Sequence, residues 1–401
     1  MPPRIIFGGM SGRVHALVLW LALLVVACRR GEPETIQDRG TDSGSSRGTP
    51  SSSPISVDSS AGEIDIVLGP ERLDGAGGES AMRIARPVAV ALPVDGWLRS
   101  VRVDVVDGQG RILPKRLLHH VNVIAPEHRE LFSPIMLRIG AAGPETAPIE
   151  LPRVLGYRVH RGDSLLVAAM LANPSPQPLS DVWVRVRLGY VAAGTWLPPL
   201  SIHPFYVDVM PPAGSHAYDL PPGHSEKSWE GRPAIAGRML AVGGHLHQYG
   251  VALRFRDVTA GRELWVAQPV RDSAGEVLAV PTTKFLWRGG VTIYPDHEYR
   301  LTAVYENPTG HVIPDGAMGT LGGVFLPAHG ERWPEVARGN PSYRLDVQVT
   351  YDTTVTMKMA SDPTHDMPMM RSPSENTRHA LDPAVAGASS PTTRSGLSTA
   401  P

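Results

Sequence analysis

The sequence of 401 residues has little cysteine and almost no net charge. Cys28 is its single cysteine, so no disulfide can form within the chain. The formal net charge is −1 and no long basic run occurs, so nothing in the sequence indicates a nucleic-acid partner. No P-loop and no G-x-G-x-x-G opens a helical segment, which leaves no sign of a phosphate-binding loop.

The N-terminal apolar run, residues 16–27, is too short for a comfortable bilayer span. It follows Arg4 and Arg13 and ends in VVAC, a pattern typical of a signal peptide. This ending resembles the lipobox of bacterial lipoproteins, in which the cysteine, here Cys28, is lipidated and becomes the first residue. By the same resemblance, Arg29 fits retention in the outer membrane, facing the periplasm or the cell surface. The alternative is an ordinary signal peptide with an unrelated cysteine.

The chain also lacks helical periodicity of useful length beyond that segment. It contains 41 Gly and 39 Pro, whose spread along the chain disfavours long helices. Period-two runs bounded by turn residues are frequent, and DVWVRVRLGY at 181–190 is the clearest. The last of them, YRLDVQVTYDTTV at 343–355, is also expected to be a strand. We therefore predict an all-β fold of antiparallel jelly rolls or β-sandwiches.

Composition divides the chain into five segments. Residues 1–28 are the expected lipoprotein signal peptide, and 29–60, rich in Ser, Gly, Pro and charge, are expected to be a disordered tether. A Pro- and His-rich stretch places a domain junction near residue 195, which gives β domains at 61–195 and 196–352. Residues 353–401 return to Ser, Thr, Pro and Ala and are expected to be a disordered tail.

Three short motifs carry candidate metal ligands. In GGHLHQYG, His245 and His247 are two residues apart, so in a strand they point to the same face and can hold one metal. LLHHVNV places His119 and His120 at a strand end, and Met318 lies in a Gly-rich turn before an apolar strand. Imidazoles with a thioether suit copper, whereas zinc would more often recruit a carboxylate or thiolate. The alternative is that each histidine pair is simply polar and lies at a strand end.

The order HH, H-x-H, Met on two β domains resembles the copper type II, ascorbate-dependent monooxygenases, which include the peptidylglycine hydroxylating and dopamine β-monooxygenases. The stretch from GGHLHQYG to GAMGTLGGVF is also similar to bacterial relatives and to the plant stress-up-regulated nodulin family. The resemblance covers roughly residues 85–330. It implies two jelly-roll domains, each holding one copper, across an open gap. Carried over, oxygen is activated at copper on His245, His247 and Met318, and the electron-supplying copper lies on His119 and His120.

One position departs from that family. The third histidine of the electron-supplying site is expected in LLVAAMLANP, where this chain has Met170. A site with Met170 would be softer and would favour Cu(I), although a core methionine is an equal alternative. The tail holds Met357, Met359, His365 and further methionines, which could collect Cu(I) or be low-complexity sequence.

Three functions follow as hypotheses. The first is a copper monooxygenase that hydroxylates a small-molecule substrate. The second is a copper-binding or copper-delivery lipoprotein without turnover, whose partners are copper donors or acceptors. The third is a β-sandwich module that binds carbohydrate or protein. In each case, membrane contact is expected through the lipid anchor alone.

Overall fold

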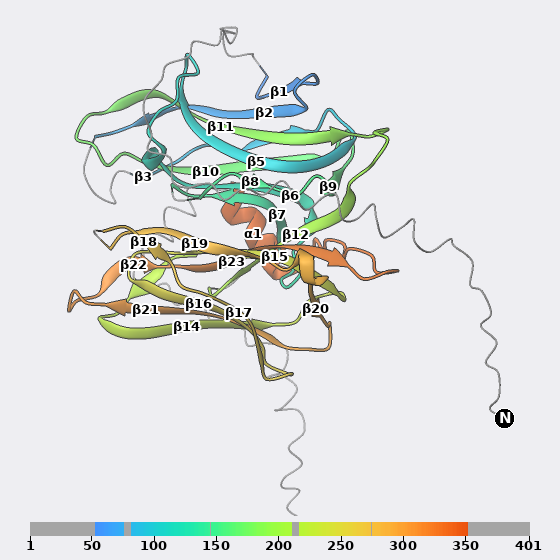
Figure 1. Cartoon of the computed structure of the whole chain (residues 1–401). Coiled ribbons are helices and arrows are strands. Elements are labelled where there is room, and N and C mark those ends of the chain that lie inside the picture. The colour runs from blue at the N-terminus through green and yellow to red at the C-terminus, as the bar shows by residue number, and fades with distance from the viewer. Residues whose placement is uncertain (1–52, 76–81, 145, 211–215, 274, 352–401) are drawn as a thin grey trace, which may run out of the picture. The chain divides into compact units, whose positions relative to one another are not determined.

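The computed structural model describes residues 53–75, 82–144, 146–210, 216–273 and 275–351 (Figure 1). Its described residues belong to one compact unit and are mostly strands, so the predicted all-β sandwich fold is confirmed. The predicted signal peptide with Cys28, most of the predicted tether and the Met-rich tail lie outside the described residues. Among the residues described, no helix is long and apolar enough to span a membrane.

The largest sheet in the described part of the chain runs in the order β1-β2-β11-β5-β9-β12-β23-β15-β19-β18, with β8 beside β5 and β20 beside β15. Strands β9 and β12 pair in parallel, with Leu155 opposite Leu200, and this pairing joins the earlier strands to the later ones. The bounds are β1 Ile55–Asp58, β2 Glu63–Leu73, β5 Gly96–Asp107, β8 Ile149–Glu150, β9 Leu155–Val159, β11 Leu179–Ala192, β12 Leu200–Asp208, β15 Gly237–Leu246, β18 Val270–Arg271, β19 Val277–Lys284, β20 Val291–Ile293 and β23 Gly319–Pro327.

Two smaller sheets each cover one part of the large sheet. One has the order β3-β10-β6-β7, with β4 beside β10, and the other has the order β14-β21-β16-β17; β13 and β22 form a separate pair. The bounds are β3 Met82–Ile84, β4 Val88–Ala91, β6 Leu118–Arg129, β7 Met136–Ala142, β10 Ser164–Ala172, β13 Tyr218–Leu220, β14 Gly223–Gly231, β16 Gly250–Asp257, β17 Arg262–Ala267, β21 Tyr299–Asn307 and β22 Ile313–Ala317. Short 3₁₀ turns lie at Lys115–Leu117 and Leu286–Arg288.

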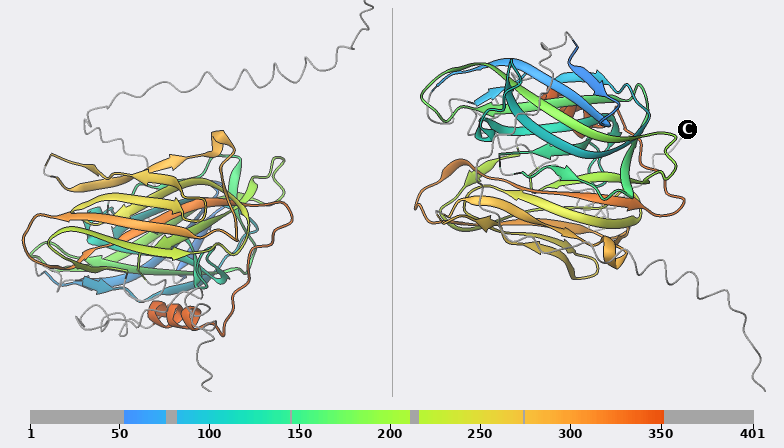
Figure 2. Two further views of the ribbon diagram at one scale, coloured as in Figure 1. Left: turned by 90° about the horizontal axis from the view of Figure 1, so that it is seen from below. Right: turned by 45° about the horizontal axis from the view of Figure 1, so that its top comes forward.

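Each sandwich has its own apolar core. In the first, the inward residues of β2 and β11 pack against β6 and β10, and Val184 and Val121 are both almost fully buried. In the second, Phe205 and Phe325 of the large sheet pack against Phe255 of β16. Figure 2 shows the two sandwiches from two further sides. The alternation that predicted strand 181–190 therefore produces one fully buried face, since Val182, Val184, Val186 and Leu188 have no exposed area.

The expected strand at 343–355 is wrong: residues Pro341–Tyr351 form the helix α1. Asn340 caps it, because its Oδ1 accepts the N–H of Ser342 at 2.9 Å, and Pro341 occupies the first helical position, where its missing N–H costs nothing. Tyr343 and Asp346 are the buried residues of this helix, and their spacing of three places both on one face. A start signal and a buried face at helical spacing therefore override a period-two pattern.

The tether boundary also needs correction. It was expected to reach residue 60, but Ile55–Asp58 form β1, which pairs with β2. Ile55 and Val57 alternate with polar residues and pack against the first core, which explains the extra strand. The junction expected near residue 195 falls in the loop between β11 and β12.

Candidate metal centre

His119 and His120 lie at an irregularity of β6. Across β10, His120 pairs with Met170 and Leu118 pairs with Leu171, so His119 is an extra residue in β6. Such a β-bulge changes the direction of side chains, which otherwise alternate between faces. Both imidazoles consequently line the same cavity, with ring centroids 4.2 Å apart.

His245 and His247 lie at the end of β15. His245 pairs with Thr320 of β23, and the strand ends one residue later, at Leu246. The ring centroids of His245 and His247 are 5.1 Å apart, and both side chains line the cavity. The same-face arrangement expected from their spacing is therefore present.

His120 joins these two histidines. Its ring centroid lies 5.5 Å from that of His245 and 6.1 Å from that of His247. One ligating nitrogen of each residue lies within 4.8 Å of those of the other two, and all three residues are half-buried. Three imidazoles this close can hold one metal ion, with a position left for water or a substrate.

This arrangement contradicts the expectation of two metal sites across an open gap. His120 was assigned to a separate electron-supplying site, but it lies beside His245 and His247. The physical reason is that β6 of the first sandwich faces the end of β15 in the second. His119 stays next to His120 but is not part of the close group of three.

The hydroxyl of Tyr305 links the backbone of Met318 to that of His247. This hydroxyl accepts the backbone N–H of His247 at 2.9 Å and that of Met318 at 3.0 Å, and it donates to the carbonyl oxygen of Met318. Tyr305 has no exposed area, and burial raises its pKa to about 12, so the hydroxyl stays protonated and able to donate. One buried hydroxyl thus holds the backbone of His247 and Met318 together.

Met170 faces the cavity. It is half-buried, whereas its neighbours Ala169 and Leu171 belong to the first core. Because Met170 pairs with His120 across β10 and β6, its thioether lies on the side of the sheet that carries the histidine. Met170 is therefore not a packed core methionine, which was one of the two alternatives for this residue.

The charge state of His120 suits a ligand. Burial is the largest influence on its pKa, followed by the neighbouring imidazoles of His119, His245 and His247, and together they lower the pKa well below the ordinary value. The ring is therefore neutral at neutral pH, and a neutral imidazole nitrogen is the form that binds metal.

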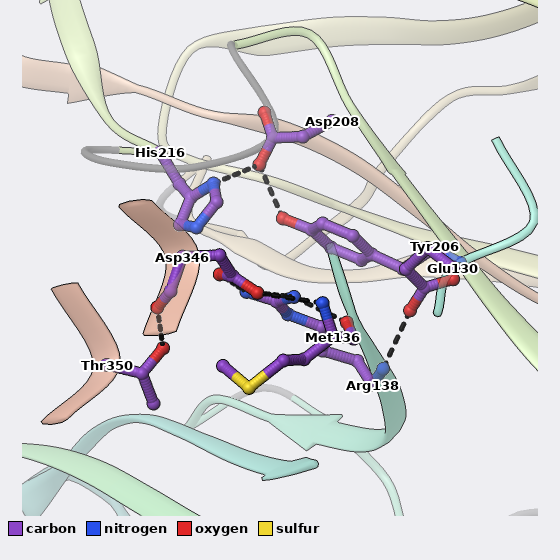
Figure 3. Close-up of polar contacts among 8 residues, drawn as sticks. All are labelled: Glu130, Met136, Arg138, Tyr206, Asp208, His216, Asp346 and Thr350. Carbon is purple, nitrogen blue, oxygen red and sulfur yellow. Dashed lines mark hydrogen bonds and ion pairs between the residues drawn. The ribbon is translucent and has the colours of Figure 1, made fainter. Parts of the chain in front are cut away.

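A fifth cavity histidine, His216, was missed by the sequence analysis. Its Nδ1 lies 2.8 Å from a carboxylate oxygen of Asp208, which is buried and also accepts the hydroxyl of Tyr206 (Figure 3). Asp208 accepts the backbone N–H of Met210 as well. The ring and the carboxylate are close enough for an electrostatic contact, but the ring N–H is not aligned with the oxygen for a hydrogen bond. His216 comes from the Pro- and His-rich stretch noted above, whose lack of periodicity gave no indication of where the ring would point.

A buried ionic network lies beside this pair. Arg138 of β7 donates to both carboxylate oxygens of Asp346 on α1, and Asp346 also accepts the N–H of Met136 at 2.9 Å (Figure 3). Glu130 accepts the backbone N–H groups of Arg138 and Tyr206, at 2.7 and 2.9 Å. The network therefore ties α1, β7 and β12 together behind the cavity.

Comparisons with known proteins do not identify the chain. No family model matches it, and no curated protein matches it. Among solved structures, a peptide described as recombinant N-glycanase F (PNGase F) is similar with a TM-score of 0.38 and 10% identity, covering 66% of this chain and 96% of that one. The Broad Bean Stain Virus structure is similar with a TM-score of 0.29 and 11% identity, covering 69% of this chain and 92% of that one. Likeness at this level carries no argument about function, so the functional case depends on the histidine centre.

Proposed function

We propose that this protein is a copper-binding, monooxygenase-like lipoprotein that hydroxylates an organic substrate with O₂ and two electrons from an ascorbate-like reductant, one oxygen atom entering the C–H bond and the other leaving as water. The observation that carries the proposal is the group of His120, His245 and His247, whose ligating nitrogens lie within 4.8 Å of one another. The motif order described above, which resembles the copper type II monooxygenases, supports the same reading. The structure differs from that family pattern in one respect that matters, because it gathers the three histidines at one centre.

The donor atoms favour copper over zinc. Three imidazoles alone would also suit zinc, so the argument depends on the methionines Met170 and Met318, which line the same cavity. Thioethers are soft ligands that suit Cu(I), while zinc sites seldom use them. A centre with imidazoles and nearby thioethers can therefore hold copper in both of its common oxidation states.

The chain's own residues would have distinct tasks at such a centre. Copper would supply oxygen activation, and the three histidines would hold it on the cavity wall. Tyr305 fixes the backbone of His247 and Met318, which keeps the ligands in place. His216 lies on the same cavity wall with its ring beside the buried carboxylate of Asp208, which places a polar side chain near the histidine group.

Metal analysis followed by oxygen uptake tests this function. The purified full-length chain, loaded with Cu(II), should retain one copper and consume O₂ with ascorbate, and His245→Ala should lose both. His224→Ala is the matched control, because His224 is exposed and pairs with Glu306. No retained copper in the parent protein would refute the proposal.

A copper-delivery role without turnover is the second candidate. It is favoured by the position of Met170 opposite His120, since a thioether there stabilises Cu(I). The same experiment separates the two roles. One retained copper with no ascorbate-driven oxygen uptake would support delivery, and copper with uptake would support the oxygenase.

The location in the envelope is also a proposal. It depends on the apolar run that ends at Cys28. Cys28→Ala should prevent lipidation and release the protein from the membrane fraction, because stable anchoring needs the several acyl chains of a lipoprotein cysteine. Membrane retention equal to that of the parent would rule out the lipid anchor.

A further inference from the structure

A large cavity extends from the histidine centre between the two sandwiches. Its volume is about 1210 Å³, above the range of roughly 300–1,000 Å³ common for small-molecule sites. Apolar side chains from both sandwiches line it, among them Leu98, Ile139, Leu155, Ile202, Leu240 and Val324. Most of these belong to the first core cluster or pack against it, so the cavity is continuous with apolar surface.

A path without large side chains leads away from the histidines along the cavity wall. His245, Gly243 and Ala241 alternate along β15 and face the same side. Opposite them on β23 are Thr320, Gly322 and Val324. Since a strand rises about 3.3 Å per residue, the path from His245 to Ala241 is roughly 13 Å long.

Gly322 is the open point of this path. A Cβ added there would meet no heavy atom within 4 Å, and its backbone is not in the left-handed region. Gly322 pairs with Gly243 on one side and with Tyr206 on the other. The sheet therefore has room for a side chain at this position, and the room belongs to the cavity.

We propose that the substrate of the centre is an extended, apolar organic molecule that lies along Ala241, Gly243 and Gly322 with its reacting end at the three histidines. This rests on the proposed function above. Polar side chains such as Arg99, Asn122 and Lys284 also line the cavity. However, Ala241, Gly243 and Gly322 themselves offer no side-chain partner to the hydroxyl groups of an oligosaccharide, which is unfavourable for such a ligand. An aliphatic chain loses nothing there and gains from leaving water.

Binding of 11-(dansylamino)undecanoic acid tests this proposal in the full-length protein. Its fluorescence should rise on binding to the metal-free chain, and Cu(II) on the histidines should then quench it. Gly322→Phe should weaken probe binding at least tenfold, and Gly322→Leu should have a smaller effect. Gly339→Phe is the matched control, since Gly339 also has open space but is exposed outside the cavity.

Displacement of the probe by competing ligands is the second experiment. Decanol should displace the probe, whereas maltohexaose should not. Undiminished probe binding by Gly322→Phe, or displacement by maltohexaose alone, would overturn the proposal. Copper stoichiometry is measured separately: a chain that binds the probe but no copper would refute the oxygenase function and leave the apolar site standing.

Discussion

At the scale of single residues, Tyr305 holds the centre together although it contributes no ligand. Its hydroxyl makes three hydrogen bonds to the backbone of His247 and Met318. Tyr305→Phe leaves the buried N–H and carbonyl of Met318 and the half-buried N–H of His247 without this partner, which costs about 1–3 kcal/mol of stability. Loss of a contact that supports metal ligands typically lowers metal affinity about 10–100-fold, so Tyr305→Phe should weaken copper binding by a factor of that size.

Copper titration and urea unfolding of Tyr305→Phe and of one control variant check this prediction. Tyr299→Phe is the matched control, because Tyr299 is equally buried on the same strand and its hydroxyl accepts only the N–H of Tyr294. It should lose stability but keep its copper affinity. Equal copper affinity in Tyr305→Phe and Tyr299→Phe would show that Tyr305 does not support the centre.

His203 gives a pH-dependent prediction at the same scale. Its ring stacks on Trp333 at 4.0 Å, and its Nδ1 is buried with no hydrogen-bond partner within the described chain. Burial, with a smaller contribution from His128, lowers its pKa to about 4. Below pH 6.5 the unfolded chain therefore binds a proton that the folded chain does not, so stability is lost as the pH falls towards 4.

His203→Phe should remove that loss. Phenylalanine keeps the stacking on Trp333 and has no polar atom to desolvate, so the variant should be about as stable as the parent at pH 7, or more so by about 1 kcal/mol. At pH 5 the free energy of unfolding of the variant should exceed that of the parent by a larger amount than at pH 7. Urea midpoints at both pH values measure it, and an unchanged difference between pH 7 and pH 5 would contradict the assignment.

At the scale of elements, α1 is attached to β7 by one buried ion pair. The side chains of Arg138 and Asp346 are 7% and 3% exposed. Asp346→Ala leaves the guanidinium buried without its carboxylate, and breaking a buried pair in this way costs about 3–5 kcal/mol. Asp74→Ala is the control, because the Arg72–Asp74 pair is exposed and should contribute about 0–1 kcal/mol.

Urea unfolding compares these two variants directly. A loss in Asp346→Ala as small as that in Asp74→Ala would show that α1 is not fastened by this pair. Near-ultraviolet circular dichroism of both variants reports whether the packing around Tyr343, which contacts the same part of the first sandwich, changes with the helix.

The strands and the helix also show which parts of the fold local sequence can predict. Period-two alternation predicts strands such as β11, because one face of each is buried and local spacing decides which. The alternation in YRLDVQV favours a strand, whereas the helix α1 that forms there starts at a cap that the alternation does not reveal. The bulge in β6 could not be predicted, since it depends on the pairing with β10 and local sequence does not contain that pairing.

At the scale of the whole molecule, the candidate centre depends on contacts between distant parts of the chain. The spacing of His245 and His247 predicted that they share a face, which concerns one strand. The approach of His120 requires the first sandwich to lie against the second, with β9 paired to β12. Asp208 ends β12 and His216 lies just before β13, so their contact is local, yet no pattern in the sequence indicates that the ring faces the carboxylate.

The most direct test of the account is electron paramagnetic resonance of the Cu(II)-loaded full-length protein, combined with metal analysis. We expect one Cu(II) per chain with coupling from three imidazole nitrogens, and the loss of one nitrogen or of the copper in His120→Ala. His119→Ala should leave the spectrum and the stoichiometry unchanged, because His119 lies outside the close group of three. Two coppers per chain, or a His120→Ala spectrum identical to that of the parent, would contradict a single centre built from His120, His245 and His247.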